Sequence, residues 1–386
     1  MTQVNGRRYD TGESVSIGIN DGTIVSVTPI NEDEHSLPFI APGLFDLQIN
    51  GYGGVWFCSE ELTPADVQSV CREYFAHGVT RMFPTLITSS YESLANGFAA
   101  IRRAREEHPW VADMVPGCHL EGPYISGEDG PRGAHPRQHV RRPDWDEFRR
   151  LQQASGDTIR LITLSPEWDN APEFIRQAVA SGVRVAIGHT AANTEQIAAA
   201  IDAGATLGTH LGNGSHGMIR RHPNYIWDQL ADDRLTASLI TDGHHLPDNV
   251  MRVFCRVKGP SRTVITCDAS GWAGCTPGQY GEGELAVEVL PTGRIVVAGQ
   301  TQYLAGSGAT TEVCVSTAMR VAGMSLRDAI DSAGRIPAEF MGLEDIHLGV
   351  GSRADLITFR MREGAELAIE RVIAAGQEQF CANGSS

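Results

Sequence analysis

Apolar runs of strand length recur along the chain, and most are followed by stretches whose apolar residues have helical spacing. The runs predict strands near residues 39–50, 78–88, 115–125, 159–167, 183–190, 205–213, 236–246 and 263–270. Amphipathic stretches between them predict helices, for example over residues 64–78, 171–182 and 193–204. This alternation predicts an α/β protein with a TIM-like (β/α)8 barrel; a doubly wound sheet, which usually has fewer strands, is the alternative.

The two ends of the chain have a different pattern from the middle. Residues 14–30 contain two short strand-like runs separated by the turn sequence Asn20-Asp21-Gly22, and residues 349–380 also have the pattern of strands. We therefore predict a small β-sandwich domain built from both termini, residues 1–40 and 348–386, and a barrel domain over residues 41–347. Residues 285–304 have the pattern of a hairpin inserted before the last helices.

Length and charge narrow the class of protein. The 386 residues suffice for one large domain and a smaller one. The formal net charge of −16 argues against non-specific binding to nucleic acid or to an anionic membrane, so we expect neither as a partner. Lys258 is the single lysine, so an anion site would consist of arginine, backbone N–H groups or a metal ion.

The cysteines and the hydropathy pattern predict the compartment. The eight cysteines are scattered and form no C-x-x-C pair, which argues against a zinc ribbon or a disulfide framework and favours a reducing environment. The first residues lack an apolar signal core, and no apolar run approaches the roughly 18 residues that a membrane span needs. We therefore expect a cytoplasmic protein.

Polar residues gather at the carboxyl ends of the predicted strands. In a barrel these ends converge on the face where active sites are built. One buried histidine at such a position is more often a structural residue, but a set spread over several strands is a stronger signal. The set consists of Gln48, Asn50, His119, Glu121, His189, His210, Asp242, His244, His245 and Asp268.

Part of this set has the composition of a catalytic metal site. Glu121, His189 and His210 offer one carboxylate and two imidazoles, which leaves an open position on a tetrahedral zinc ion for water. Such an ion acidifies water and polarises a carbonyl group. Asp268, one strand removed from these residues, is placed to accept a proton and pass it on. Affinity and availability favour Zn²⁺, with Fe²⁺ or Mn²⁺ as the alternatives.

Several segments resemble the amidohydrolase superfamily and, within it, the N-acetylglucosamine-6-phosphate deacetylase family. The resemblance covers residues 40–360 and rests on the motifs PGLFDLQINGYGG, HLEGPYI, GHT, THLGN, TDGHH, CDAS, LAGS and GVGSRADLITF. It implies a metal-dependent (β/α)8 barrel with a small β-sandwich, and a homodimer. It also implies hydrolysis of a linear amide, in amino sugar metabolism: removal of acetate from an N-acetylamino sugar 6-phosphate, foremost N-acetylglucosamine 6-phosphate.

Carried over motif by motif, the resemblance assigns roles to individual residues. It implies one divalent metal ion on Glu121, His189 and His210, and Asp268 as the catalytic residue. It implies that Arg221 binds the phosphate of the substrate held by the partner subunit. The remaining implied substrate contacts are Ala134, His135, Asn213, Gly214, His245 and the segment Leu304, Ala305 and Gly306.

The chain departs from the family pattern beside the sugar site. The family has Asn-Ala-Met where this chain has Asn213-Gly214-Ser215, and two tryptophans, Trp227 and Trp272, stand where the family has small residues. We expect these indoles to reshape the substrate pocket without touching the acetamide chemistry. Three alternatives therefore remain: another N-acyl substrate (N-acetylgalactosamine 6-phosphate, an unphosphorylated amino sugar or an N-acyl amino acid), a different sugar configuration, or a non-catalytic sugar-binding homologue.

The end of the first barrel strand predicts how many metal ions bind. Much of the superfamily has His-x-His there, holding a second metal ion, whereas this chain has Gln48-x-Asn50. Neutral amides are poor zinc ligands beside imidazole. We therefore expect a single ion, with Gln48 and Asn50 lining the site or bonding to the neighbouring ligands. Asp46 has no assigned role beyond a structural hydrogen bond.

Overall fold

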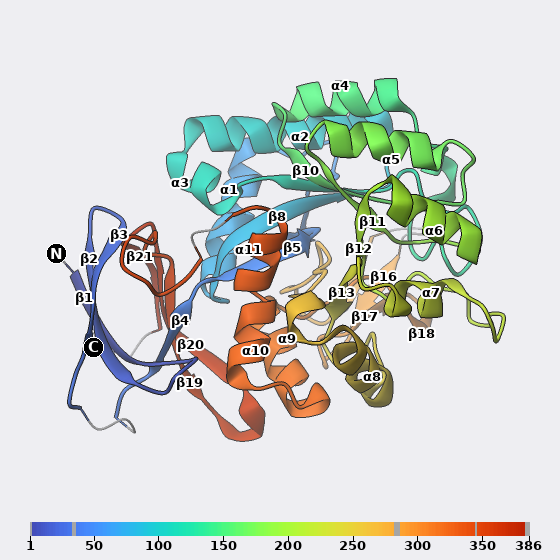
Figure 1. Cartoon of the computed structure of the whole chain (residues 1–386). Coiled ribbons are helices and arrows are strands. Elements are labelled where there is room, and N and C mark those ends of the chain that lie inside the picture. The colour runs from blue at the N-terminus through green and yellow to red at the C-terminus, as the bar shows by residue number, and fades with distance from the viewer. Residues whose placement is uncertain (1, 33–35, 282–285, 344–345, 383–386) are drawn as a thin grey trace.

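The computed structural model describes residues 2–32, 36–281, 286–343 and 346–382 (Figure 1). Its centre is a parallel sheet of eight strands in chain order, and an isolated bridge joins Ile49 of the first strand to Ala269, three residues after the last strand. The predicted α/β barrel is therefore confirmed. The strands are β5 (Leu44–Ile49), β8 (Val79–Ile87), β9 (Cys118–Glu121), β10 (Ile159–Leu164), β11 (Arg184–Ile187), β12 (Ala205–Gly208), β13 (Thr236–Ile240) and β14 (Thr263–Thr266).

Helices surround the barrel on its outside (Figure 1). Their starts follow local signals: Thr63 and Asp66 form a reciprocal capping box before the first helix. They are α1 (Pro64–Phe75), α2 (Tyr91–Glu107), α3 (Pro109–Met114), α4 (Trp145–Ser155), α5 (Ala171–Ala180), α6 (Thr194–Ala203), α7 (Tyr225–Ala231), α8 (Asp248–Lys258), α9 (Thr311–Thr317), a π-helical turn η4 (Ala318–Ala322), α10 (Leu326–Ser332) and α11 (Arg335–Phe340). Short 3-10 turns are η1 (Arg137–His139), η2 (Pro260–Arg262) and η5 (Glu363–Ala365).

The barrel interior is apolar at the amino-terminal ends of the strands and polar at their carboxyl-terminal ends. Phe45, Phe83 and Leu161 pack together at the amino-terminal side of the barrel interior, and Ile336 of α11 and Met341, the residue after that helix, close this side. Because the amino-terminal ends of the strands are filled in this way, the carboxyl ends are the open face.

The lysine of the chain stabilises the end of a helix. Lys258 is buried, and its Nζ donates hydrogen bonds to the carbonyl oxygens of Gln229, Asp232 and Leu235 at 2.7, 2.9 and 2.8 Å. These carbonyls lie at and after the end of α7, where a helix leaves acceptors without internal donors. Burial lowers the pKa of Lys258 to about 8.

Both ends of the chain form one seven-stranded sheet, shown to the left in Figure 1. Apolar side chains from its two halves, such as Ile17 and Leu356, share one core, so the sheet closes over itself as a sandwich. The domain limits 1–40, 348–386 and 41–347 stay a prediction. The strands are β1 (Thr2–Arg8), β2 (Ser14–Asn20), β3 (Thr23–Pro29), β4 (Phe39–Pro42), β19 (Leu356–Met361), β20 (Leu367–Ala374) and β21 (Gln377–Cys381).

A smaller antiparallel sheet follows the last barrel strand. It contains β15 (Gly278–Tyr280), β16 (Val287–Val289), β17 (Ile295–Val297) and β18 (Gln300–Leu304). A two-stranded hairpin, β6 (Gly51–Tyr52) with β7 (Val55–Trp56), follows β5. The predicted hairpin over 285–304 was therefore too small, and its residue 285 lies outside the described residues.

The predicted strand over residues 39–50 is wrong as a single strand. The chain makes β4 in the small sheet and then, after Gly43, β5 in the barrel. A Cβ atom at Gly43 would lie 2.1 Å from Oγ1 of Thr80, so the crossing depends on a glycine. The other predicted strands have the right order but extend past the observed carboxyl ends. Within the described residues, no helix is long and apolar enough to cross a bilayer.

Candidate active site

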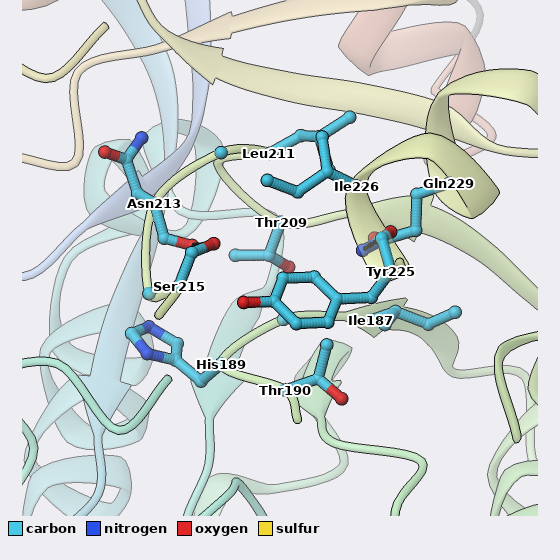
Figure 2. A pocket seen from close by; sticks show the side chains of 13 residues that line it. Ile187, His189, Thr190, Thr209, Leu211, Asn213, Ser215, Tyr225, Ile226 and Gln229 are labelled. Carbon is cyan, nitrogen blue, oxygen red and sulfur yellow. Dashed lines mark hydrogen bonds between the residues drawn. The ribbon is translucent and has the colours of Figure 1, made fainter. Parts of the chain in front are cut away.

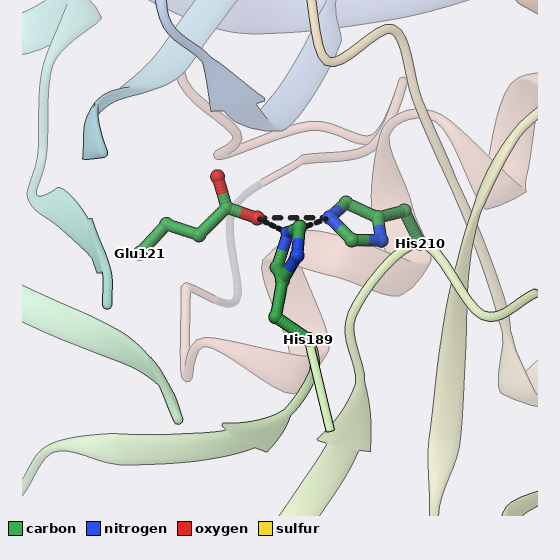
Figure 3. Close-up of side chains that lie close together, drawn as sticks. All are labelled: Glu121, His189 and His210. Atoms are coloured by element: carbon green, nitrogen blue, oxygen red, sulfur yellow. Dashed lines mark hydrogen bonds and ion pairs between the residues drawn. The ribbon is translucent and has the colours of Figure 1, made fainter. Parts of the chain in front are cut away.

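Glu121, His189 and His210 meet at the open face of the barrel (Figure 3). Glu121 ends β9, and the two histidines follow β11 and β12. Oε1 of Glu121 lies 3.3 Å from Nε2 of His189 and 2.9 Å from Nε2 of His210, and the two Nε2 atoms are 3.1 Å apart. All three side chains are buried. The structure thus brings together the three residues that the sequence grouped.

The ring of His189 is oriented by a backbone carbonyl. Nδ1 of His189 lies 2.8 Å from the carbonyl oxygen of Pro131 and donates its proton there, so Nε2 carries the lone pair. Gly214 lies against the same ring: a Cβ atom at this residue would be 2.6 Å from Nδ1, and its φ is +55°. A larger residue at 214 would therefore displace the ring.

The donor set fits a tetrahedral metal ion. Ligand atoms about 2.0–2.2 Å from zinc stand about 3.3–3.6 Å from one another. The three observed separations, 2.9, 3.1 and 3.3 Å, are close to this spacing. A carboxylate oxygen and a ring lone pair facing each other in a buried space are best stabilised by a cation. Burial acts to raise the pKa of Glu121, but the close approach of the His189 and His210 rings outweighs it and holds that pKa well below its usual range.

Three of the site residues have an unusual backbone conformation. His189, His210 and Asp268 have φ values of 50°, 29° and 49°, in the left-handed region that residues with a Cβ rarely adopt. Each follows the end of a parallel strand, where the turn aims the side chain across the barrel mouth. Such strain is concentrated at functional sites, where surrounding contacts hold it in place.

Two amides connect Asp268 to the metal-ligand candidates. Nε2 of Gln48 donates to Oε1 of Glu121 at 2.8 Å and to Oδ1 of Asp268 at 2.9 Å. Nδ2 of Asn50 also donates to Oδ1 of Asp268, at 2.8 Å. Burial and then the charge of Glu121 raise the pKa of Asp268 to about 7. A cation beside Glu121 would lower it again.

Asp46, which had no clear role in the sequence, closes the barrel seam beneath the site. Its carboxylate accepts hydrogen bonds from the backbone N–H groups of Gln48 and Cys267 at 3.0 and 2.9 Å. It also accepts from the hydroxyls of Thr266 and Thr311. Asp46 therefore ties the end of the first barrel strand to the residue before Asp268.

His135 is the third imidazole at the site. Its Nε2 lies 3.2 Å from Nε2 of His189, and its Nδ1 lies 2.8 Å from the hydroxyl of Thr88. Burial and the neighbouring His189 hold the pKa of His135 well below its usual value, which favours a neutral ring. Thr88 and Pro131 were not identified from the sequence, because the contact of a hydroxyl or a carbonyl with a distant ring has no sequence signal.

The other predicted contacts lie on loops around this cluster. Nδ2 of Asn213 donates to the carbonyl of His210 at 3.2 Å. Asn213 and Gly214 line a small pocket that begins at His189 and reaches Tyr225 (Figure 2). Ala134 is exposed next to His135.

The remaining substrate residues come from two further loops. The segment Leu304, Ala305 and Gly306 ends the inserted sheet, and Gly306 lies against Ser270, two residues after Asp268. Arg221 is exposed on the loop that leads from His210 to α7.

The two tryptophans are placed differently from one another. Trp272 stacks on Tyr280 with ring centroids 5.0 Å apart and meets Trp56 edge-on at 6.4 Å. It therefore anchors the inserted sheet to the β6–β7 hairpin. Trp227 lies on α7 with 49% of its surface exposed.

Comparison with known proteins shows the family of the chain. The model of the amidohydrolase family matches residues 39–378. Human N-acetylglucosamine-6-phosphate deacetylase is 35% identical over 329 residues, 82% of this chain and 78% of the relative. N-acetylgalactosamine-6-phosphate deacetylase of Escherichia coli O157:H7 is 30% identical over 345 residues, 88% of this chain and 89% of the relative.

The fold is also that of solved structures. A mutant of N-acetyl-D-glucosamine-6-phosphate deacetylase from Mycobacterium smegmatis, in complex with N-acetyl-D-glucosamine-6-phosphate, superposes with a TM-score of 0.86 at 30% identity, over 98% of this chain and all of the other. The enzyme of the same name from Thermotoga maritima has a TM-score of 0.86 at 25% identity, over 99% of this chain and all of the other. Family model, relatives and fold agree: the chain belongs to the amidohydrolase family.

Proposed function

We propose that this protein hydrolyses the acetamide of an N-acetylamino sugar 6-phosphate, foremost N-acetylglucosamine 6-phosphate, to the amino sugar phosphate and acetate. The convergence of Glu121, His189 and His210 beside the buried Asp268 carries the proposal. The names of the relatives supply the substrate class. A catalytically inactive sugar-binding homologue is disfavoured because the full set of polar groups for hydrolysis is present.

The chemistry divides between the ion and the protein. One divalent ion, which we propose to be Zn²⁺, would be held by Glu121, His189 and His210 and would supply a Lewis acid that activates water and polarises the amide carbonyl. Asp268 takes the proton of the attacking water and delivers it to the departing amine. Gln48 and Asn50 hold its Oδ1, which leaves Oδ2 to face the reacting atoms.

The remaining residues bind and orient the sugar. The neutral His135 is placed to donate a hydrogen bond to the oxygen that gains charge during attack. The loops that carry Ala134, Asn213, Gly214, His245 and Leu304 to Gly306 surround the sugar in this proposal. We also propose a cytoplasmic homodimer in which Arg221 reaches the phosphate in the partner's site.

A substrate screen tests this function. We expect deacetylation to be fastest with N-acetylglucosamine 6-phosphate among N-acetylglucosamine, N-acetylgalactosamine and N-acetylmannosamine, each with and without a 6-phosphate. N-acetylgalactosamine 6-phosphate is the second candidate, because one relative carries that name. Equal rates with and without phosphate would contradict the proposal, and no release of acetate from any of the six would overturn it.

Replacing Arg221 with alanine should raise KM for the phosphorylated sugar by about 10- to 100-fold, with a smaller change in kcat. One hydrogen bond to a charged group contributes about 1.5–3 kcal/mol, and a planar guanidinium binds two phosphate oxygens at once. Steady-state kinetics measure the change. Arg220→Ala is the matched control, because Arg220 is also exposed and precedes Arg221. An unchanged KM in Arg221→Ala would remove the phosphate role.

The purified protein should contain one metal ion per chain, as measured by elemental analysis without chelators. Gln48 and Asn50 occupy the place where His-x-His would hold a second ion, and both amides donate to carboxylates instead. Two ions per chain would contradict this expectation. Well under one ion, with activity retained, would contradict the metal-dependent mechanism.

A further inference from the structure

The turn after β13 places a carboxylate directly behind a predicted sugar contact. Asp242 and His245 stand three residues apart in the sequence Asp-Gly-His-His. Both side chains are largely enclosed, with 2% of the aspartate side chain and 9% of the histidine side chain exposed. His245 also contributes to the electrostatic environment of Asp268. The pair therefore lies at the catalytic face, yet neither the metal cluster nor the proton transfer uses Asp242.

The two oxygens of Asp242 have separate partners. Oδ1 accepts the backbone N–H groups of His244 and His245 at 2.8 and 2.9 Å. Oδ2 accepts the ring N–H at Nδ1 of His245 at 2.8 Å and the hydroxyl of Ser307 at 3.3 Å. The backbone contacts alone would fix the turn. The Oδ2 contacts go further, because they reach the ring of His245 and a second loop.

The contact with Asp242 determines which ring nitrogen of His245 carries the proton. Burial acts to raise the pKa of Asp242, but the hydrogen bond from His245 outweighs it and lowers that pKa to about 2. An ionised carboxylate only accepts, so Nδ1 of His245 must donate. In the neutral ring, Nε2 then has a free lone pair and presents a hydrogen-bond acceptor.

Ser307 extends this contact to the rest of the substrate site. It directly follows the segment Leu304–Gly306, and its backbone N–H donates to the carbonyl of Asp268 at 3.2 Å. Its carbonyl accepts the backbone N–H of Ser270 at 2.9 Å. Asp242 is thus hydrogen-bonded to the turn that carries His245 and to Ser307, whose backbone pairs with the segment that contains Asp268.

We infer that Asp242 is a positioning residue that holds His245 with Nε2 as an acceptor for a hydroxyl group of the bound sugar, and that it keeps this turn in register with the segment Leu304–Gly306. The identity of the ligand, a sugar hydroxyl, rests on the proposed function. The orientation of the His245 ring rests on the hydrogen bonds of Asp242 alone. Asp242 acts through His245 and touches no reacting atom.

The substitution Asp242→Asn tests this role with little change in shape. The introduced amide must keep its oxygen toward the two backbone N–H groups of His244 and His245, because its NH₂ group would oppose two donors there. The NH₂ group then faces Nδ1 of His245 and reverses the tautomer, so that Nε2 becomes a donor. We expect KM for the sugar phosphate to rise about 10-fold, the cost of one disrupted hydrogen bond.

Nitrogen NMR of ¹⁵N-histidine-labelled, zinc-loaded protein reads the tautomer directly, with His245→Gln identifying the signal. We expect Nδ1–H in the parent protein and Nε2–H in Asp242→Asn. We also expect Nδ1–H in Ser307→Ala, which removes the hydroxyl that donates to Oδ2 of Asp242 and accepts from the backbone N–H of Ala309 but keeps the carboxylate. Asp248→Asn is the control for loss of a carboxylate, because Asp248 is an exposed aspartate on α8. The same tautomer in the parent and in Asp242→Asn would overturn the positioning role.

A double-mutant cycle separates positioning from a purely structural effect. If Asp242 acts through His245, adding Asp242→Asn to His245→Gln should cost little further activity. Fully additive losses would overturn the inference. If the parent enzyme hydrolyses no N-acetylhexosamine 6-phosphate, the proposed function and the sugar-hydroxyl contact are both overturned. The NMR measurement of the His245 tautomer would still decide whether Asp242 orients the ring.

Discussion

Replacing Asp268 with asparagine should lower kcat by about 100- to 10,000-fold, the range that one positioned proton-transfer group contributes. The amide has nearly the same shape but cannot take a proton from water or give one to the departing amine. The measurement is kcat under saturating sugar phosphate, together with metal content by elemental analysis. We expect the metal content to stay unchanged, because among the described residues the hydrogen bonds that join Asp268 to Glu121 run through Gln48.

Asp248→Asn is the matched control for this substitution, since Asp248 is an exposed aspartate on the outside of the barrel. It should retain parental kcat. Activity within a few-fold of the parent in Asp268→Asn would refute the assigned role. Lost activity accompanied by lost metal would show that Asp268 is a ligand instead.

Replacing His210 with alanine should abolish both metal binding and turnover. It removes one of the three converging donor atoms and leaves Glu121 and His189 as a two-residue set that no longer defines a tetrahedral site. Elemental analysis should give well under one ion per chain, and acetate release should fall below detection. Circular dichroism checks that the fold is kept.

His347→Ala controls for the loss of a histidine as such, because His347 is exposed on the loop after α11. This variant should keep its metal and its activity. A full complement of metal in His210→Ala would mean that another residue, with His135 as the nearest candidate at 3.2 Å from His189, takes the vacated position.

The barrel and the core of the site could be predicted because both depend on local patterns. Glu121, His189 and His210 each end or follow a short apolar run, and parallel strands in one barrel bring such ends together. The small sheet was recognised from strand-like runs at both termini. The single strand predicted over residues 39–50 is two strands, since the apolar run continues through Gly43 and only the packing against Thr80 shows where the chain changes sheets.

The contacts that join distant loops could not be predicted from one sequence. Ser307 is 65 residues from Asp242, and Thr311 is 265 residues from Asp46, yet each donates a hydrogen bond to that carboxylate. Serine and threonine residues that donate such hydrogen bonds recur at no regular spacing in the sequence. A buried serine therefore cannot be told from an exposed one until the fold is known. The same holds for the stack of Trp272 on Tyr280, which anchors the inserted sheet.

The buried Lys258 has a practical consequence for handling the protein. It is the single lysine, its ammonium group is enclosed by three carbonyl oxygens, and it is 1% exposed. Acylating dyes, aldehyde cross-linkers and amine-coupling surfaces therefore find no lysine to react with on the folded chain. Such reagents should leave Lys258 unmodified while the protein is folded, so that modification of this lysine would report unfolding around α7.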